Sequence, residues 1–344
     1  MKRVDLSKTL LFSLCILLAP GQVISAESDR GEITGGIAHD LPGWFKDSFL
    51  EIAEDATEAG DADRHVLLFF NLNACPYCAR MLDESFREEP NKGLIQTHFD
   101  VISLNVLGDR EVVFNEEITV SEKELAEILN VRATPGVMFL DANNRPVARA
   151  DGYRAPESFR QILEFVSTRA YRETELSEFV ERQKSLDSYP LRDNPLFSEV
   201  SDLSSVSGPL MVVFEDGGCL DCNEFHDTIL SDTRVEAELA PYTVVRVDTG
   251  SDASIVDPAG NETTAGEFAR AHQVIYRPGV LIFDDGELIR RLDSLVYPHH
   301  FSLSLRYVGG GYNDQMDYDA FSEQRTEEML AAGIDIDLGP PGQH

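Results

Sequence analysis

The pattern of apolar and polar positions predicts a buried strand followed by a helix near residue 75. Val66–Phe70 is an unbroken apolar run, too short to span a bilayer and of the length of a strand buried on both faces. After a short turn the period changes, because Met81, Leu82, Ser85 and Phe86 recur at helical spacing. A strand leading through a turn into a helix is therefore expected here.

The flanking sequence predicts further alternating elements. Ser121 to Glu124 has the residues of a capping box and marks the start of a helix that runs to Val131. The apolar spacing predicts a helix at 44–58, a strand at 98–107, a strand at 136–140 and a closing helix at 156–171 extended by 173–184.

The same order of elements recurs in the second half of the chain. Cys219 follows Cys75 by 144 residues and Pro278 follows Pro135 by 143, a register typical of an internal repeat. Strands at 209–214, 242–248 and 279–283 and a capping box at 264–267 repeat the first set. The sequence predicts two tandem α/β domains at 40–185 and 209–320, a linker at 186–208 and a tail at 321–344.

Composition narrows the class of partner. The 344 residues are 42% hydrophobic, which suffices for two packed cores. The formal net charge of −32 argues against nucleic acid and anionic membrane surfaces as partners. Residues 1–26 have the basic start, apolar centre and small-residue end of a secretory signal, and the alternatives are a retained anchor and a lipidated Cys15. We therefore expect a periplasmic protein that does not bind tightly to membranes once the signal is removed.

Cysteine spacing points to redox chemistry. Without Cys15 of the signal, four cysteines remain, and they form two pairs of the form Cys-x-x-Cys. In an oxidising compartment such pairs are best explained as redox pairs, and a zinc site shared between them is unlikely at this separation. The start of a helix stabilises a thiolate, and Pro76 suits the first helical position. The candidate catalytic residues are Cys75, Cys78, Cys219 and Cys222.

The order strand, Cys-x-x-Cys helix, Thr134-Pro135, strand, turn, strand and final helix resembles the thioredoxin-like superfamily. The resemblance implies a cis bond before Pro135, Cys75 as nucleophile and Cys78 as resolving thiol. It also implies a substrate groove at the following candidate binding residues: Pro76, Tyr77, Thr134, Pro135, Arg277 and Pro278.

Domain one also resembles SoxW-type periplasmic thioredoxins associated with sulfur oxidation. This resemblance depends on four segments, which are Cys75–Met81, Leu107–Val112, Thr134-Pro135 and Gly152-Tyr153. It implies a thiol–disulfide oxidoreductase outside the cytoplasm.

Several positions depart from the thioredoxin pattern. Phe69 and Val213 stand where thioredoxins keep a buried carboxylate, and Ala74 replaces the usual Trp. Cys-Pro-Tyr-Cys is the glutaredoxin form, whose reduction potentials are about −200 to −230 mV, so an intermediate potential is predicted.

Acidic residues around the second pair suggest a direction of electron flow. Asp221 lies between its cysteines and Glu215, Asp216 and Glu224 lie near them, which disfavours a thiolate. The second pair would then have the less acidic nucleophile and the more stable disulfide. We therefore expect electrons to pass from domain two to domain one. His226 is expected to be a solvated helix residue, and His299-His300 is a weak metal candidate.

These features predict an extracytoplasmic thiol–disulfide oxidoreductase of the reductase type, acting through a mixed disulfide. Its partners would be protein thiols and disulfides, with a membrane electron donor as a further candidate, and no cofactor or metal is expected. Two alternatives stay open: a disulfide isomerase, or a binding or holdase module in which the second pair is a structural disulfide.

Overall fold

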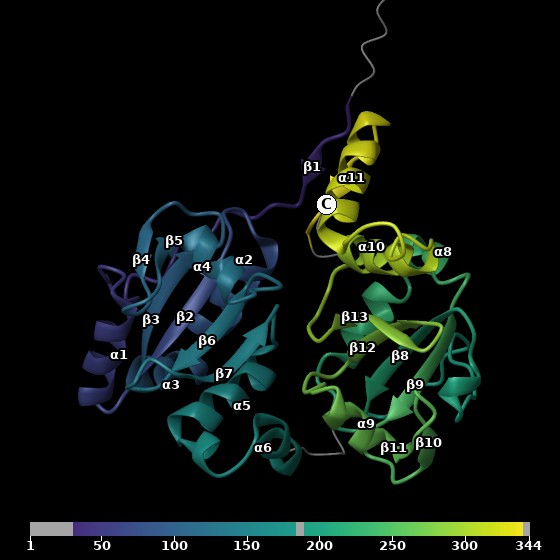
Figure 1. The fold of residues 1–344 in the computed structure, drawn as a ribbon, viewed down its shortest axis with the longest axis horizontal. Coiled ribbons are helices and arrows are strands. Elements are labelled where there is room, and N and C mark those ends of the chain that lie inside the picture. The colour runs from purple at the N-terminus through teal and green to yellow at the C-terminus, as the bar shows by residue number, and fades with distance from the viewer. Residues whose placement is uncertain (1–29, 184–188, 340–344) are drawn as a thin grey trace, which may run out of the picture.

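The computed structural model describes residues 30–183 and 189–339, which form two α/β domains side by side (Figure 1). The predicted signal at 1–26 lies outside the described residues. Within the described ranges, no helix has both the length and the apolar character needed to cross a bilayer. The predicted fold class, two α/β domains in tandem, is confirmed.

Domain one is built on a four-stranded mixed sheet of order β3-β2-β6-β7. Only β2 and β3 are parallel, and the other neighbours are antiparallel. The strands are β2 His65–Asn71, β3 Phe99–Asn105, β6 Gly136–Leu140 and β7 Pro146–Asp151, with a hairpin of β4 Glu111–Val113 and β5 Thr119–Ser121. The helices are α1 Ile52–Asp61, α2 Pro76–Met81, the π-helix η1 Leu82–Phe86, α3 Asn91–His98, α4 Glu122–Ile128, α5 Pro156–Ser167, the 3-10 turn η2 Ala170–Arg172 and α6 Leu176–Gln183.

Both faces of the central strand are buried, as its apolar run predicts. Successive side chains of a strand point to opposite faces. Leu67 and Phe69 pack toward α2, α3 and α5, whereas Leu68 and Phe70 pack toward α1 and α4. The capping box at Ser121 is confirmed, with both of its reciprocal hydrogen bonds formed.

Domain two repeats this plan with a sheet of order β9-β8-β12-β13. Its strands are β8 Pro209–Glu215, β9 Thr243–Asp248, β12 Gly279–Asp284 and β13 Glu287–Leu292, with a hairpin of β10 Ser254–Val256 and β11 Glu262–Thr264. Its helices are the 3-10 turn η3 Leu203–Ser205, α7 Cys222–Glu224, the π-helix η4 Phe225–Ile229, α8 Thr233–Glu238, α9 Ala265–Ala271, α10 Pro298–Gly309 and α11 Tyr318–Ala331. The second capping box, at Thr264, is also confirmed.

The first predicted helix begins later than its apolar spacing suggests. The helix α1 starts at Ile52, because Leu50 has a left-handed backbone with φ of 63° that no right-handed helix can continue through. Trp44 therefore lies in a loop, stacked on Phe86 with ring centroids 6.4 Å apart. Phe49, which fitted the helical spacing, is 97% exposed.

The predicted tail at 321–344 is wrong over its described part. Residues 318–331 form α11, and Phe321 is buried against Tyr307 and Tyr312. After α11, β14 Ile336–Asp337 pairs in parallel with β1 Ile33–Thr34 near the other end of the chain. Figure 1 shows β1 lying beside α11 before the chain crosses to domain one.

The predicted linker is ordered from Tyr189 onward, while 184–188 lie outside the described residues. The Tyr189 amide donates to the Gly217 carbonyl (2.8 Å), and the Ser198 amide donates to the Val244 carbonyl (2.7 Å). This stretch therefore lies against domain two.

One apolar cluster runs through both domains. It contains Phe69 and Tyr153 of domain one together with Met211, Leu295 and Tyr297 of domain two. The domains thus share a packed boundary in addition to their covalent connection.

Removing the buried ring of α11 tests whether this helix belongs to the fold. Phe321→Ala is expected to lower the free energy of unfolding by about 3–5 kcal/mol, the usual cost of deleting a buried Phe side chain. Denaturant unfolding of the full chain measures this change. Phe49→Ala is the matched control and should change stability by less than about 0.5 kcal/mol, because the Phe49 ring is exposed. Equal losses in the two variants would contradict the assignment.

Candidate active site

The first cysteine pair lies at the start of α2, shortly after the end of β2. Cys75 is the N-cap of α2, and its Sγ accepts a hydrogen bond from the Cys78 amide (3.1 Å). The two cysteines form a disulfide, with Cys75 7% exposed and Cys78 fully buried. In the reduced state the same amide and the positive end of the helix would stabilise a Cys75 thiolate.

The loop carrying Thr134 and Pro135 faces this pair. The peptide bond between these two residues is cis. The Sγ atom of Cys75 lies 3.6 Å from the Thr134 Oγ1 and 3.8 Å from the Thr134 carbonyl oxygen. Cys75, Pro76, Tyr77 and Thr134 all line a cleft of about 1510 Å³ between the domains. A disulfide that enters this cleft can therefore reach Cys75.

Tyr77 is held in the boundary between the domains. Its ring stacks on Tyr297 with centroids 4.2 Å apart, and its hydroxyl accepts a hydrogen bond from the Tyr297 amide (2.7 Å). The same hydroxyl lies 3.3 Å from His300 Nδ1. Tyr77 is therefore not an exposed loop aromatic, and it forms part of the cleft wall.

A second contact between the domains is the ion pair of Arg80 and Glu224. The Arg80 guanidinium donates two hydrogen bonds to the Glu224 carboxylate, at 2.8 and 3.0 Å. Its plane also lies over the Tyr153 ring, 4.4 Å from the centroid. Helix α2 is thus fixed to domain two directly beside Cys75.

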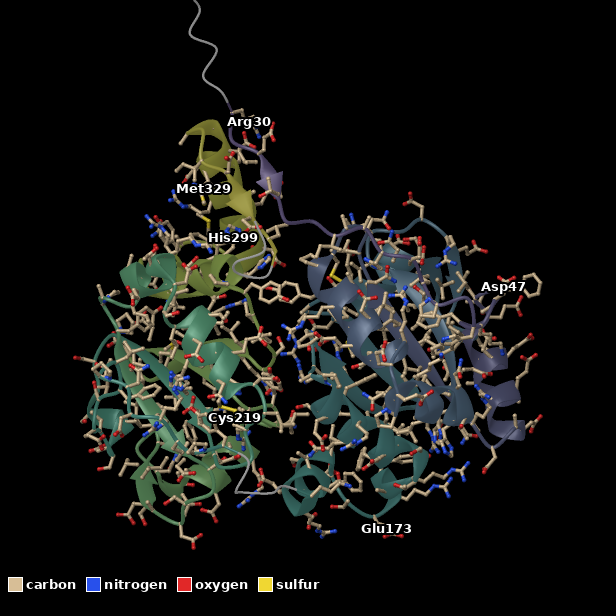
Figure 2. All side chains as sticks on the ribbon, turned by 180° about the vertical axis from the view of Figure 1, so that it is seen from behind. Arg30, Asp47, Glu173, Cys219, His299 and Met329 are labelled. Atoms are coloured by element: carbon tan, nitrogen blue, oxygen red, sulfur yellow. A yellow bond between two sulfur atoms is a disulfide. The ribbon has the colours of Figure 1, made fainter. Side chains whose placement is uncertain are left out.

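The second cysteine pair is buried. Cys219 is 3% exposed, Cys222 is fully buried, and the two form a disulfide (Figure 2 labels Cys219). Tyr189 and Leu191 pack on both sulfur-bearing residues. A cavity of only about 40 Å³ remains beside Leu220, and it is walled by α5, α6 and the loop before Pro278.

Arg277, predicted to bind substrate beside Pro278, turns inward instead. Its guanidinium donates to Asp216 (3.0 Å) and to the carbonyls of Val274 and Tyr276 (2.9 and 3.1 Å), and only 4% of its side chain is exposed. The bond before Pro278 is cis, as in domain one. Arg277 therefore stabilises its own loop, and it lines the small cavity beside Leu220 rather than the cleft beside Cys75.

The acidic residues near the second pair are compensated, contrary to expectation. Glu215 accepts from His226 Nε2 (2.7 Å) and both residues are buried, so His226 is not solvated. Asp216 pairs with Arg277, and Glu224 pairs with Arg80. These three carboxylates therefore do not supply the unpaired negative charge from which electron flow from domain two to domain one was expected.

Asp221 is the acidic group near these cysteines that burial perturbs. It is 6% exposed, and its carboxylate accepts a hydrogen bond from the Tyr276 hydroxyl (2.5 Å). Burial raises the pKa of Asp221 from 3.8 to about 6, although the Tyr276 hydrogen bond opposes the rise.

His299 and His300 contact each other, and both take part in side-chain packing. Burial lowers the pKa of His299 to about 4, and His300 contacts the Tyr77 ring. Across the described ranges, no group of three or more His, Cys, Asp or Glu side chains is arranged to hold a metal ion.

Three features were not found from the sequence. The Arg80–Glu224 pair had a detectable signal, because its members are 144 residues apart, the same offset as the cysteines, and carry opposite charge. The packing of Tyr189 against the second cysteine pair could not be predicted, because a linker sequence does not indicate which surface the linker packs on. The arginines of the cleft were equally hidden, since they come from separate loops.

Comparison with known proteins identifies a relationship for both domains. A family model described as a thioredoxin-like domain matches residues 52–167 and 198–309. A thioredoxin-fold protein from Helicobacter pylori is 23% identical, covers 39% of this chain and 95% of that chain, and has a TM-score of 0.32. A thioredoxin from Thermus thermophilus is 27% identical, with coverages of 33% and 82% and a TM-score of 0.26. The first two thioredoxin domains of Saccharomyces cerevisiae Eps1p are 12% identical, with coverages of 72% and 89% and a TM-score of 0.24. No curated protein matches the chain.

The raised pKa of Asp221 predicts a pH-dependent stability. Folding favours the neutral carboxyl, so its stabilising contribution is complete below about pH 3.8 and is lost as the pH rises through about 6. Asp221→Asn is expected to raise the free energy of unfolding at pH 7.5 by on the order of 2 kcal/mol and to change it little near pH 4. Denaturant unfolding at both pH values measures this. The exposed Asp252→Asn is the control, and a pH-independent effect of Asp221→Asn would refute the prediction.

The cover over the second pair predicts unequal reduction of the two disulfides. With dithiothreitol, Cys75–Cys78 is expected to be reduced faster than Cys219–Cys222, because Tyr189 and Leu191 pack against the second pair. Tyr189→Ala should accelerate reduction of the second pair and leave the first unchanged, which makes the first an internal control. Timed alkylation followed by mass spectrometry of the cysteine peptides measures both rates. Equal rates for the two pairs in the unmodified protein would show that the cover has no effect.

Proposed function

The chain belongs to the thioredoxin-like domain family, and from this membership and the setting of Cys75 we propose that it is an extracytoplasmic protein-disulfide reductase. One observation carries the proposal. Cys75 caps a helix, faces the Thr134 loop at 3.6 Å and lines an open cleft of about 1510 Å³. These are the conditions that an attacking thiolate needs, namely ionisation, alignment and access.

The reaction begins with reduced domain one. The Cys75 thiolate attacks one sulfur of the partner's disulfide, that bond breaks, and the other partner sulfur leaves as a thiolate that takes up a proton. Cys78, once deprotonated, then attacks the Cys75 sulfur, which releases the second partner thiol and forms the Cys75–Cys78 disulfide. Two electrons pass to the partner in total. A dithiol donor, which we propose to be membrane-bound, restores the reduced state.

The location and the finer family are part of the proposal. The signal-like residues 1–26 and the use of four cysteines in two pairs support an oxidising compartment outside the cytoplasm, which we take to be the periplasm. The segments around Cys75, Gly108 and Tyr153 support a relationship to SoxW-type thioredoxins. Protein thiols and disulfides are the expected partners.

The second pair is assigned a different role. Cys219–Cys222 is buried in a cluster with Tyr189 and Leu191, and its neighbours Gly218 and Leu220 line a cavity of only about 40 Å³. This burial favours a structural disulfide in domain two, so turnover is assigned to Cys75–Cys78 alone. Because a structural second pair is compatible with both a reductase and a holdase, activity must decide between them.

Cysteine variants separate these functions. Cys75→Ser is expected to abolish reduction of insulin by dithiothreitol above the uncatalysed rate, because it removes the attacking sulfur. The double variant Cys219→Ser, Cys222→Ser should keep most of the rate. Insulin turbidity measures reduction, and recovery of activity by a scrambled disulfide substrate measures isomerisation. Suppression of aggregation by a Cys-free variant, with no reduction by the unmodified protein, would instead establish the holdase.

A further inference from the structure

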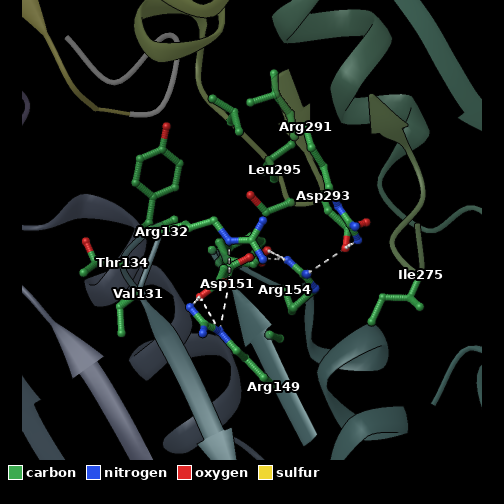
Figure 3. A pocket seen from close by; sticks show the side chains of 18 of the residues that line it. Val131, Arg132, Thr134, Arg149, Asp151, Arg154, Ile275, Arg291, Asp293 and Leu295 are labelled. Carbon is green, nitrogen blue, oxygen red and sulfur yellow. Dashed lines mark hydrogen bonds and ion pairs between the residues drawn. The ribbon is translucent and has the colours of Figure 1, made fainter. Parts of the chain in front are cut away.

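A network of charged side chains lies in the cleft beside Cys75. Figure 3 shows that it joins the Thr134 loop and β7 of domain one to the end of β13 in domain two. We name it the arginine network, and its members are Arg132, Arg149, Arg154, Arg291, Asp151 and Asp293.

The arginine network carries an excess of positive charge. Its four guanidinium groups face two carboxylates, although the chain as a whole has a formal charge of −32. Asp151 is already engaged by Arg149, at 2.8 Å and 3.0 Å, and Asp293 is engaged by Arg291 at 3.1 Å. The other two ion pairs of the network are longer, with Arg132–Asp151 at 3.7 Å and Arg154–Asp293 at 3.8 Å, which leaves positive charge available to a ligand.

Arg132 is the least satisfied member. Its nearest carboxylate oxygen is Asp151 Oδ2 at 3.7 Å, and 60% of its side chain is exposed. Among the described residues it makes no side-chain hydrogen bond. By contrast, Arg154 is 3% exposed and lies over the Tyr276 ring, 4.9 Å from the centroid. Arg132 is therefore the guanidinium that an incoming anion meets first.

The position of Arg132 connects this charge to the reacting sulfur. It precedes Thr134 by two residues, and Thr134 Oγ1 lies 3.6 Å from Cys75 Sγ. Both residues line the same cleft as Cys75. Because an extended chain advances about 3.3–3.6 Å per residue, a group one to three residues from a bound disulfide falls within reach of Arg132.

We propose that the cleft selects disulfides flanked by carboxylate side chains, with Arg132 as the residue that determines this preference. The inference rests on the proposed function and names its substrate class. The occupant is an acidic polypeptide segment, because about 1510 Å³ exceeds the roughly 300–1,000 Å³ of small-molecule pockets. Glu175, Asp317 and Asp319 also line the cleft, together with Arg270 and Arg290, so its lining as a whole has six arginines and five carboxylates. Acidic groups elsewhere in the chain that lie beyond about 8 Å are largely screened at physiological salt.

Matched peptides test the preference. Three peptides share one internal disulfide and differ only in the residues that flank it, which are Glu, Gln or Lys, and dithiothreitol supplies electrons at 0.15 M salt. The unmodified protein is expected to show kcat/KM about two- to fivefold higher for the Glu peptide than for the Lys peptide, the range for a partly exposed ion pair. Arg132→Gln should reduce this ratio to about one, chiefly through KM.

A charge-matched control removes a distant arginine. Arg30 lies beside the end of α11, apart from Cys219 (Figure 2), and it pairs with the exposed Glu327. Arg30→Gln changes the net charge as Arg132→Gln does, and it should keep the full preference for the Glu peptide. An Arg132→Gln ratio equal to that of the unmodified protein would overturn the inference. Equal loss of preference in both variants would do the same, since it would assign the effect to net charge.

Binding without turnover separates this inference from the proposed function. Fluorescence anisotropy with labelled analogues, in which Ser replaces both peptide cysteines, should show two- to fivefold tighter binding of the Glu analogue, lost in Arg132→Gln. If no peptide is reduced but this difference persists, the proposed function fails and the inference stands. If all peptides are reduced equally and no analogue is preferred, only the inference fails. Preference for the small disulfide dithiodipropionate over the Glu peptide would overturn the polypeptide assignment.

Discussion

The contact between Arg80 and Glu224 is the interaction on which the rest of the arrangement depends. It fixes the helix that begins at Cys75 to the corresponding helix of the other domain, and the stack of Tyr77 on Tyr297 extends the same contact. The two charged residues occupy equivalent positions of the repeat. Two identical copies meeting in this way would bring like charges together, whereas two repeats in one chain can carry opposite charges there. Because Tyr77 also lines the cleft, this contact forms part of the cleft wall.

The two Cys-x-x-Cys pairs share one repeated motif, but they differ in their surroundings. Both cysteine pairs lie at the start of a helix, and each domain has a cis-proline loop, which Cys75 contacts directly in domain one. Cys75 of the first pair lines the cleft, whereas the second pair is packed against Tyr189, and its neighbour Leu220 lines a small cavity shared with α5 and α6 of the other domain. The difference therefore lies in what surrounds each motif. Glu215 and Asp216 are paired with His226 and Arg277, because buried charges persist only when they are paired.

Local features were predictable from the sequence, and contacts between distant segments were not. The apolar run before Cys75 and the capping residues Ser121 and Thr264 act over a few residues, so their pattern specifies the element directly. Phe49 shows the limit, since it fits a helical period that the backbone of Leu50 interrupts. The helix α11 was missed because few of its residues are apolar and buried, so its pattern resembled a solvated tail. The inward turn of Arg277 and the neighbours of Arg132 depend on the packing of separate loops.

The pairing of β1 with β14 gives the two domains a second connection, in addition to the linker. The chain leaves domain one through the linker and returns, through β14 and the paired β1, to the segment that enters domain one again. Ile37 on that segment donates its amide to the Ala74 carbonyl, next to Cys75. Two domains that are joined at two separated points, and that also pack against each other through Tyr77 and Tyr297, are restricted in sliding and in parting. The walls of the cleft beside Cys75 are therefore held in register both by this second connection and by the packed boundary.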